Sequence, residues 1–210
     1  MKDKMILKLR MCEENTDQVG NTALLQNNVW VTEDKLFIRV PEVIEEEFYD
    51  FISSVLLEFI IMKNKMDIVL LIDSYGGVLN ATMDTYNLLS AMDNKIITVA
   101  FNKCCSAACL LFALGDERYF LKDSLYILHQ VRAIVSIEDQ MQTTEIRKFA
   151  NSFENSQNEY KKIIMKKTKI PKEKLNEIFN SLEDTKFKTE EITRYCIATK
   201  IFKKFSELPL

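Results

Sequence analysis

The stretch "DIVLLIDSYGG" (residues 67–77) constrains the fold more than any other, because an apolar run of strand length ends directly on two glycines. Such a run, rich in Ile, Val and Leu, is typical of a parallel strand covered on both faces. The chain contains only four glycines, so Gly76 and Gly77 are half of them. Glycine is favoured where the backbone takes a positive φ or where another chain segment approaches closely. We therefore expect a buried strand, a tight turn and a helix.

The alternation of strand-like and helix-like segments continues on both sides of this unit. Short apolar runs predict further strands at residues 35–40, 95–101, 117–121 and 125–129. Segments of helical character predict helices at residues 43–62, 78–92 and 106–115. Alternating strands and helices indicate right-handed crossover units in an α/β layer.

The last third of the sequence is predicted to be helical. Ser136 is suited to cap a long helix whose first turn carries Glu138 and Asp139. Pro171 fits the first turn of another helix, and Thr189 fits the start of the last one. The apolar residues that we expect the long helix to turn inward are Met141, Ile146, Phe149, Phe153, Tyr160 and Ile164.

Charge and composition argue against several classes of partner. The 28 basic and 31 acidic residues leave a formal charge of -3 and are mixed along the chain, so we expect no nucleic acid partner. No apolar run approaches the length that spans a bilayer, so we expect no membrane partner. The five cysteines are an odd number, and Cys104, Cys105 and Cys109 lie in an apolar segment. This pattern favours a reducing compartment, and we predict a cytoplasmic location.

Nothing in the sequence divides the chain into several domains. No repeat, low-complexity tract or Pro/Gly/Ser-rich linker occurs. Residues 1–30 lack a sustained period and contain the turn-prone "ENTDQVGNTALLQNN", so we expect an irregular N-terminal segment. Residues 31–210 are predicted to form a single domain.

The amides of the Gly76–Gly77 turn are candidates for binding an anion or an oxyanion. The alternative is that the turn only connects a strand to a helix. A dinucleotide fingerprint is excluded, because the spaced third glycine is missing.

Ser106 in "NKCCSAACLLFALG" is a candidate nucleophile. It follows a predicted strand and begins a short helix of small residues, where unpaired amides favour negative charge. The alternative is that Ser106 merely caps this helix. A zinc site on the three nearby cysteines does not match the common ligand spacings, and Cys105 as the nucleophile is a weaker alternative.

His129 is the only histidine and ends the predicted strand "LYILH". Taken alone, it fits a buried core side chain. Taken together, the Gly76–Gly77 turn, Ser106 and His129 all follow strands of one predicted layer, where α/β folds gather their sites. This arrangement favours His129 as a general base. A histidine in that role needs a carboxylate that orients its imidazole ring.

These motifs resemble the proteolytic subunit of the Clp protease, a serine peptidase of the ClpP/crotonase fold. The resemblance rests on "IDSYGGVLNATMDTYNLLSAM", "VAFNKCCSAACLLFALGDERYFL" and "SLYILHQ", in this order, and extends from about residue 35 to residue 198. It implies an α/β fold of repeated β-β-α units that form a layered sheet core, with a long handle-like helix and a helical C-terminal part.

The resemblance also implies roles for individual residues. Ser106 takes the place of the nucleophile and His129 that of the general base, while Gly77 and Ala107 supply the oxyanion amides. For the third triad member, "EDTKFKTEEITRYCIA" resembles the family's tail. Alignment from Tyr195 puts Asp184 at the catalytic aspartate. Alignment from Phe187 and Thr189 puts Thr185 there instead.

The family further implies a homo-oligomeric, heptameric ring, a Clp-type ATPase unfoldase as partner, and unfolded proteins or short peptides as substrates. No cofactor and no metal is needed for this chemistry. Two other functions stay open: a catalytically silent ring subunit or assembly factor, and a crotonase-type acyl-CoA enzyme. The chain departs from the family where Tyr75 replaces a proline, where Ala108 replaces a glycine, and where "HQVRAIVSIEDQ" lacks the usual proline and glycines.

Overall fold

The computed structural model describes residues 28–61, 65–132 and 142–210. The strands of this part are β1 (Val29–Val31), β2 (Lys35–Val40), β3 (Asp67–Ser74), β4 (Ile96–Cys105), β5 (Glu117–Leu121), β6 (Leu125–Leu128), β7 (Thr185–Lys186) and β8 (Lys200–Phe202). Its helices are α2 (Glu46–Ile61), α3 (Leu79–Ser90), α4 (Ala108–Leu114), α5 (Thr143–Lys167), α6 (Lys172–Asn180), α7 (Thr189–Arg194) and the short 3-10 helix η1 (Phe205–Glu207).

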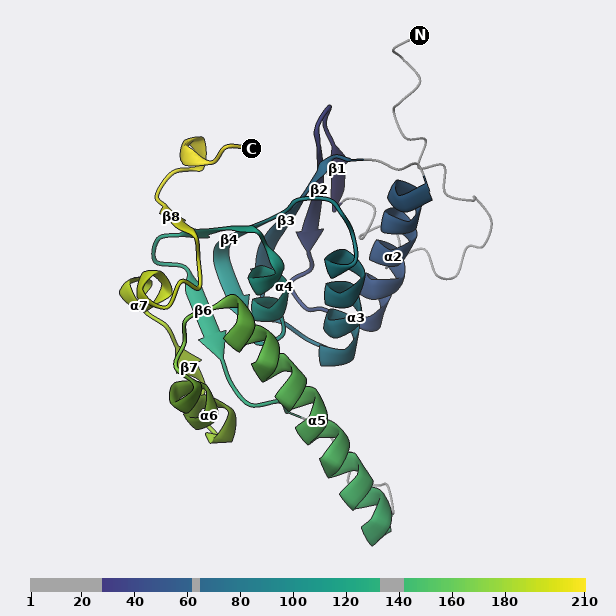
Figure 1. Cartoon of the computed structure of the whole chain (residues 1–210), viewed down its shortest axis with the longest axis vertical. Helices are drawn as coiled ribbons and strands as arrows, with labels where there is room; N and C mark the ends of the chain where they lie inside the picture. Colours follow the sequence, from purple (N-terminus) through teal and green to yellow (C-terminus); the bar gives the residue numbers. More distant parts are fainter. Residues whose placement is uncertain (1–27, 62–64, 133–141) are drawn as a thin grey trace.

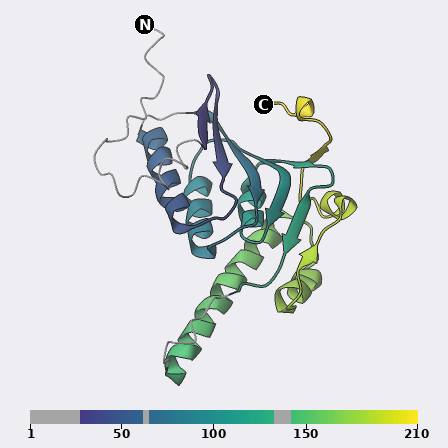
Figure 2. The same ribbon diagram turned by 180° about the vertical axis from the view of Figure 1, so that it is seen from behind.

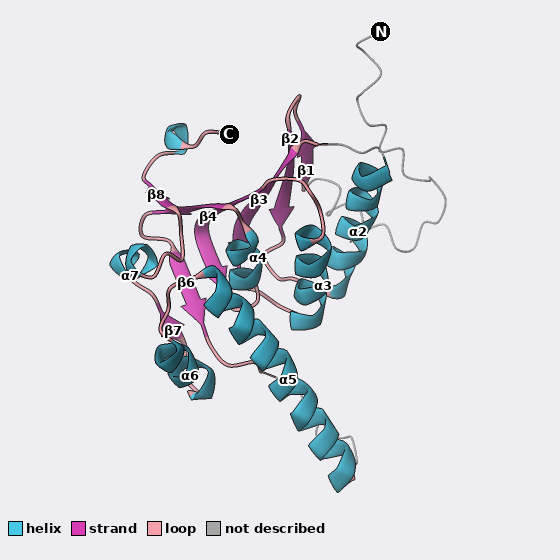
Figure 3. Cartoon of the chain, viewed as in Figure 1, coloured by secondary structure: helices cyan, strands magenta, loops and turns pink. Residues whose placement is uncertain are grey.

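The described strands form one sheet, drawn in magenta in Figure 3. Its main path has the order β1-β2-β3-β4-β5-β8. From β2 to β8 the neighbours are parallel, whereas β1 pairs antiparallel with β2 at one edge. Strand β4 is long enough to take two partners on one side. Its residues 97–100 pair with β5 and residues 103–105 pair with β6, which in turn pairs with β7. The sheet and its connecting helices confirm the α/β fold class.

The two faces of the sheet are covered by different parts of the chain. Successive side chains of a strand point to opposite faces. Ile68, Leu70 and Ile72 of β3 belong to the main core, beneath α2, α3 and α4 on one side of the sheet (Figures 1 and 2). Val69 of β3 instead packs in a smaller cluster with Phe202 of β8. The C-terminal segment therefore helps to cover the face opposite the helices.

Two predicted helices begin later than the sequence suggested. The prediction started α2 at Val43, but Ile44 bridges the Gly77 turn and its N–H donates to the Gly76 carbonyl at 2.8 Å. The prediction started α4 at Ser106, but β4 continues to Cys105 and α4 begins at Ala108. In both cases, contacts with a neighbouring turn replace the first helical residues.

Helix α5 extends away from the body of the molecule (Figure 1). Its C-terminal half turns Tyr160 and Ile164 into the core, as predicted. The prediction was wrong for Ile146 and Phe149, which are 53% and 36% exposed. The periodicity is that of an amphipathic helix, but the N-terminal half reaches past the sheet and lies beyond the main core.

Some predictions fall outside the described residues. These include Ser136 and Met141, and most of the N-terminal segment predicted to be irregular. In the part that is described, β1 begins at Val29, and α5 begins with a capping box built on Gln142 and Glu145. No helix among the described residues is long and apolar enough to cross a membrane.

Candidate active site

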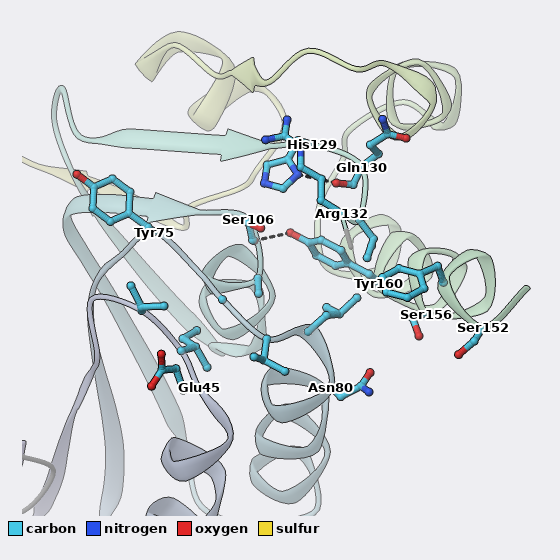
Figure 4. A pocket seen from close by; sticks show the side chains of 18 of the residues that line it. Glu45, Tyr75, Asn80, Ser106, His129, Gln130, Arg132, Ser152, Ser156 and Tyr160 are labelled. Atoms are coloured by element: carbon cyan, nitrogen blue, oxygen red, sulfur yellow. Dashed lines mark hydrogen bonds between the residues drawn. The ribbon is translucent and has the colours of Figure 1, made fainter. Parts of the chain in front are cut away.

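A pocket of about 740 Å³ lies where the turns after β3 and β4 meet the segment after β6 and one face of α5. Ser106, Ala107, His129 and Gly77 all line it (Figure 4). Four of the five residues predicted for the site are therefore brought together, although they come from three separate strand ends. Asp184, the fifth, does not line the pocket.

Ser106 has a left-handed backbone conformation, with φ at 54°. It lies in the sharp turn between β4 and α4, and the N-cap of α4 is Ala107, which makes no side-chain cap hydrogen bond. The interpretation of Ser106 as a helix cap is therefore wrong. Among the described residues, no hydrogen bond involves its hydroxyl, and the residue lines the pocket. A strained non-glycine residue at such a turn is typical of a functional position.

The Gly76–Gly77 turn packs backbone against backbone on its neighbours. Gly76 has φ at 91°, and a Cβ added to it would lie 2.6 Å from the Cys105 carbonyl oxygen. A Cβ on Gly77 would lie 2.0 Å from the Ile44 carbonyl oxygen. Only glycine fits at either position, so the glycine pair is explained by close approach. Among the hydrogen bonds of the described residues, neither the Gly77 nor the Ala107 amide acts as a donor.

His129 follows β6 directly, and its ring Nδ1 lies 2.6 Å from the Gln130 carbonyl oxygen (Figure 4). A carbonyl oxygen only accepts, so this contact requires Nδ1 to carry the proton. Nε2 then keeps its lone pair and can accept a proton from a hydroxyl. The side chain is half-buried and lines the same pocket as Ser106.

Asp184 forms an ion pair with Arg132, and both side chains are about half exposed, at 49% and 53%. The strand register nevertheless brings its backbone close to His129. In the antiparallel β6–β7 pair, Leu128 lies opposite Thr185, and His129 and Asp184 are the next residues beyond this last pair. No hydrogen bond joins His129 to Asp184 in the part of the chain that the structure describes.

The cysteines around Ser106 are poorly suited to act as nucleophiles. Cys104, Cys105 and Cys109 are all buried. Burial raises the pKa of the Cys105 thiol to about 12, so the thiolate is scarce at neutral pH. Cys109 Sγ donates to the carbonyls of Cys104 and Ile127, at 3.2 and 3.3 Å. These observations weigh against the alternative in which Cys105 attacks the substrate.

The pocket walls are mostly apolar, with Phe149 and Phe153 of α5 on one side. Tyr75, the residue that departs from the family's proline, also lines the pocket, and Lys103 Nζ lies 4.2 Å from its ring centroid. Ala108, the second departure, is fully buried and does not line the pocket.

Two polar side chains of α5 that hydrogen-bond to the backbone of the site were not identified from the sequence. Tyr160 donates to the Ser106 carbonyl, and Gln157 accepts from the Val131 N–H. The only sequence signal was the helical period that turned Tyr160 inward.

Comparison with known proteins identifies the family of the chain. Residues 26–205 match the family model described as Clp protease. The chain is 28% identical over 146 residues to "ATP-dependent Clp protease proteolytic subunit 3" of Rhodococcus jostii (strain RHA1), a match that covers 69% of each chain. It is 29% identical over 89 residues to the "ATP-dependent Clp protease proteolytic subunit" of Carsonella ruddii (strain PV), covering 41% of this chain and 45% of that one. Because the family model matches most of the chain, the protein belongs to the Clp protease family.

Proposed function

We propose that the chain is a serine peptidase subunit that hydrolyses peptide bonds of unfolded proteins or short peptides inside an oligomeric ring. The observation that carries this proposal is the shared pocket of Ser106, His129, Gly77 and Ala107. Membership of the Clp protease family supports peptide-bond chemistry over the acyl-CoA alternative.

In the proposed reaction, Ser106 Oγ attacks the scissile carbonyl carbon while His129 Nε2 takes the hydroxyl proton. His129 then gives this proton to the leaving amine, and a water molecule hydrolyses the acyl-enzyme by the same route. The Gly77 and Ala107 amides stabilise the oxyanion that develops on the substrate. Removal of one such donor typically lowers the rate about 10²- to 10³-fold.

Asp184 is the proposed third member of the triad. The β6–β7 register supports this choice over Thr185, whose side chain points to the other face of the strand. The role requires His129 to exchange one partner. His129 Nδ1–H must turn from the Gln130 carbonyl to the Asp184 carboxylate. Arg132 contacts Oδ1 of that carboxylate, which has a second oxygen able to accept a hydrogen bond.

Labelling with a fluorophosphonate, which reacts with activated serines, tests the nucleophile. We expect the wild-type oligomer to be labelled on Ser106, and both Ser106→Ala and His129→Ala to lose labelling and peptidase activity. Ser54→Ala is a suitable control, because Ser54 is exposed on α2 and lies outside the pocket. Undiminished labelling of Ser106→Ala, or a label on another residue, would contradict the assignment.

A catalytically silent ring subunit is the second candidate, and the Arg132–Asp184 ion pair favours it. In the described part of the chain, Asp184 pairs with Arg132 and makes no hydrogen bond to His129. Absence of labelling in an intact oligomer, together with co-assembly with an active subunit, would support this candidate instead.

The proposed assembly is a homo-oligomeric, heptameric ring that works with a Clp-type ATPase unfoldase. The names of both relatives, which call them ATP-dependent, motivate the ATPase partner. Native mass spectrometry tests the ring, since a heptamer has seven times the 24.5 kDa mass of the chain. A monomer or dimer at working concentration would contradict the ring.

A further inference from the structure

We propose that Tyr160 and Gln157, one turn apart on α5, are positioning residues that hold the Ser106 turn and the segment after His129 at a fixed separation. The inference rests on the proposed function, because it takes Ser106 as the nucleophile and His129 as the base. Neither side chain is proposed to touch the reacting atoms.

Tyr160 connects α5 to the Ser106 turn. Its hydroxyl donates to the Ser106 carbonyl oxygen at 2.6 Å, across 54 residues of sequence (Figure 4). The side chain is only 2% exposed, and its ring packs edge-on against Phe179 with the centroids 5.3 Å apart. A hydroxyl held this tightly by packing is a well-defined donor.

Ser106 needs such support because of its backbone conformation. A left-handed conformation costs a non-glycine residue about 1–2 kcal/mol, so surrounding contacts must maintain it. Ser106 N–H donates to the Ile127 carbonyl at 2.8 Å, and its carbonyl accepts from Cys109 N–H at 3.0 Å and from Tyr160. Of these partners, Tyr160 is the one that acts through a side chain. The direction of the Ser106 side chain is thereby tied to α5.

Gln157 connects the same helix to the segment that follows His129. Its Oε1 accepts from Val131 N–H at 2.9 Å, and its Nε2 donates to the Phe179 carbonyl at 3.1 Å. Because Gln157 and Tyr160 are three residues apart, they lie on neighbouring positions of one helix face. One rigid element thus holds the backbone beside the proposed nucleophile and beside the proposed base.

Tyr160 stays a donor throughout the working pH range. Burial raises the pKa of its hydroxyl well above the ordinary value. The hydrogen bond to Ser106 is therefore expected to persist across this range.

Tyr126 provides a matched control for Tyr160. Its side chain is fully buried, and its hydroxyl has no hydrogen-bond partner among the described residues. Both Tyr→Phe substitutions remove one buried hydroxyl and keep the ring. Only Tyr160→Phe removes a hydrogen bond to the Ser106 turn.

The experiment measures the second-order rate of fluorophosphonate labelling at Ser106, and kcat and KM for a short peptide, on the full-length oligomer. One net hydrogen bond corresponds to a factor of about 3 to 10 in rate. We expect Tyr160→Phe to lower the labelling rate and kcat by this factor, with KM and the shape of the pH profile unchanged. Gln157→Met should lower kcat similarly, while Tyr126→Phe should match the wild type.

Unfolding in urea, measured for each variant, separates a positioning effect from loss of fold. Labelling rates of Tyr160→Phe and Gln157→Met within twofold of the wild type would overturn the inference. An equal loss in Tyr126→Phe would also overturn it, because the effect would then follow from any change in the core. A wild type that is not labelled at all points instead to failure of the proposed function, on which this inference depends.

Discussion

At the scale of single residues, the site depends on two backbone conformations that few side chains tolerate. Gly76 takes φ at 91° and lies so close to the β4–α4 turn that a Cβ would be 2.8 Å from Ala107 N. Ser106 takes φ at 54° without being glycine. The glycine makes room for the Ser106 turn, and the hydrogen bonds around Ser106 keep that turn in place.

The competition between Arg132 and His129 for Asp184 leads to a residue-scale prediction. An exposed ion pair contributes about 0.2–1 kcal/mol, which corresponds to a factor of up to about five. We expect Arg132→Gln to raise kcat/KM for a short peptide by up to about fivefold, because Asp184 is then free to orient His129. Asp184→Asn should lower kcat by a factor on the order of 10⁴, as in other triads.

Thr185→Ala is the control for this pair of variants, and its kcat should stay within about threefold of the wild type. Equal losses in Arg132→Gln and Asp184→Asn would indicate that the ion pair itself supports activity. In that case Asp184 would not be the orienting carboxylate.

At the scale of elements, α6 and α7 are held together by a partly buried ion pair. Lys174 Nζ lies 2.6 Å from Glu191 Oε1, and both side chains are 29% exposed. The same ammonium lies 5.1 Å from the Phe187 ring centroid and 5.0 Å from that of Tyr195. Glu191 also accepts from Lys188 N–H, which caps α7. This small cluster joins α6 to α7, the helix that follows β7.

Glu191→Gln tests this cluster through its pH dependence. The Lys174 hydrogen bond, followed by the Lys188 N–H, holds the pKa of Glu191 below its ordinary value. The stabilisation is therefore present above the unfolded-state pKa, about 4.3, and disappears as the pH falls through the lower native value. At neutral pH we expect the variant to lose about 0.5–1 kcal/mol of unfolding free energy.

Urea unfolding of both proteins from neutral to acid pH measures this difference, which should shrink towards zero in acid. Glu190→Gln is the matched control, because Glu190 is an exposed carboxylate in the same first turn. A difference that is independent of pH would contradict the assigned role of the charge.

At the scale of the whole molecule, the C-terminal segment completes the sheet and covers its second face. Strand β8 pairs with β5, and Phe202 is fully buried. Arg118 of β5 connects this segment to the sheet through three hydrogen bonds of its guanidinium. It donates to the carbonyls of Ile197 at 2.8 Å, Gly115 at 2.9 Å and Cys196 at 3.1 Å. A single side chain thus joins the end of α4 to the segment that leads into β8.

Arg118→Met should therefore destabilise the fold more than an ordinary surface change. Three carbonyls lose a charged donor, and we expect a loss of about 3 kcal/mol in unfolding free energy, measured in urea. Arg118→Lys should lose less, because it keeps the charge but not the fork of donors. Arg39→Met, at an exposed position on β2, should change stability by less than about 0.5 kcal/mol. A similar effect at both arginines would show that the three hydrogen bonds contribute little.

Local sequence patterns were sufficient to predict the main strands and helices and the candidate site residues that directly follow the strands. The apolar runs predicted β2, β3 and β5 almost to the residue, and the helical periods predicted α2 and α3 to within about three residues at either end. The candidates Ser106, His129 and Gly77 could be recognised because each follows a strand within a short motif. Strands β1, β7 and β8 were not predicted, since two or three residues carry no period.

Other features of the site depend on contacts between distant parts of the chain. The partner of the Asp184 carboxylate, the hydrogen bond from Tyr160 to Ser106 and the exposure of Ile146 depend on what lies beside them in space. Local sequence is enough to predict which segments form strands and helices and which strand ends carry a serine, a histidine and two glycines, because these properties follow from neighbouring residues. The assembly of these strand ends around one pocket was decided by the parallel sheet and by α5, which pack residues far apart in sequence against each other.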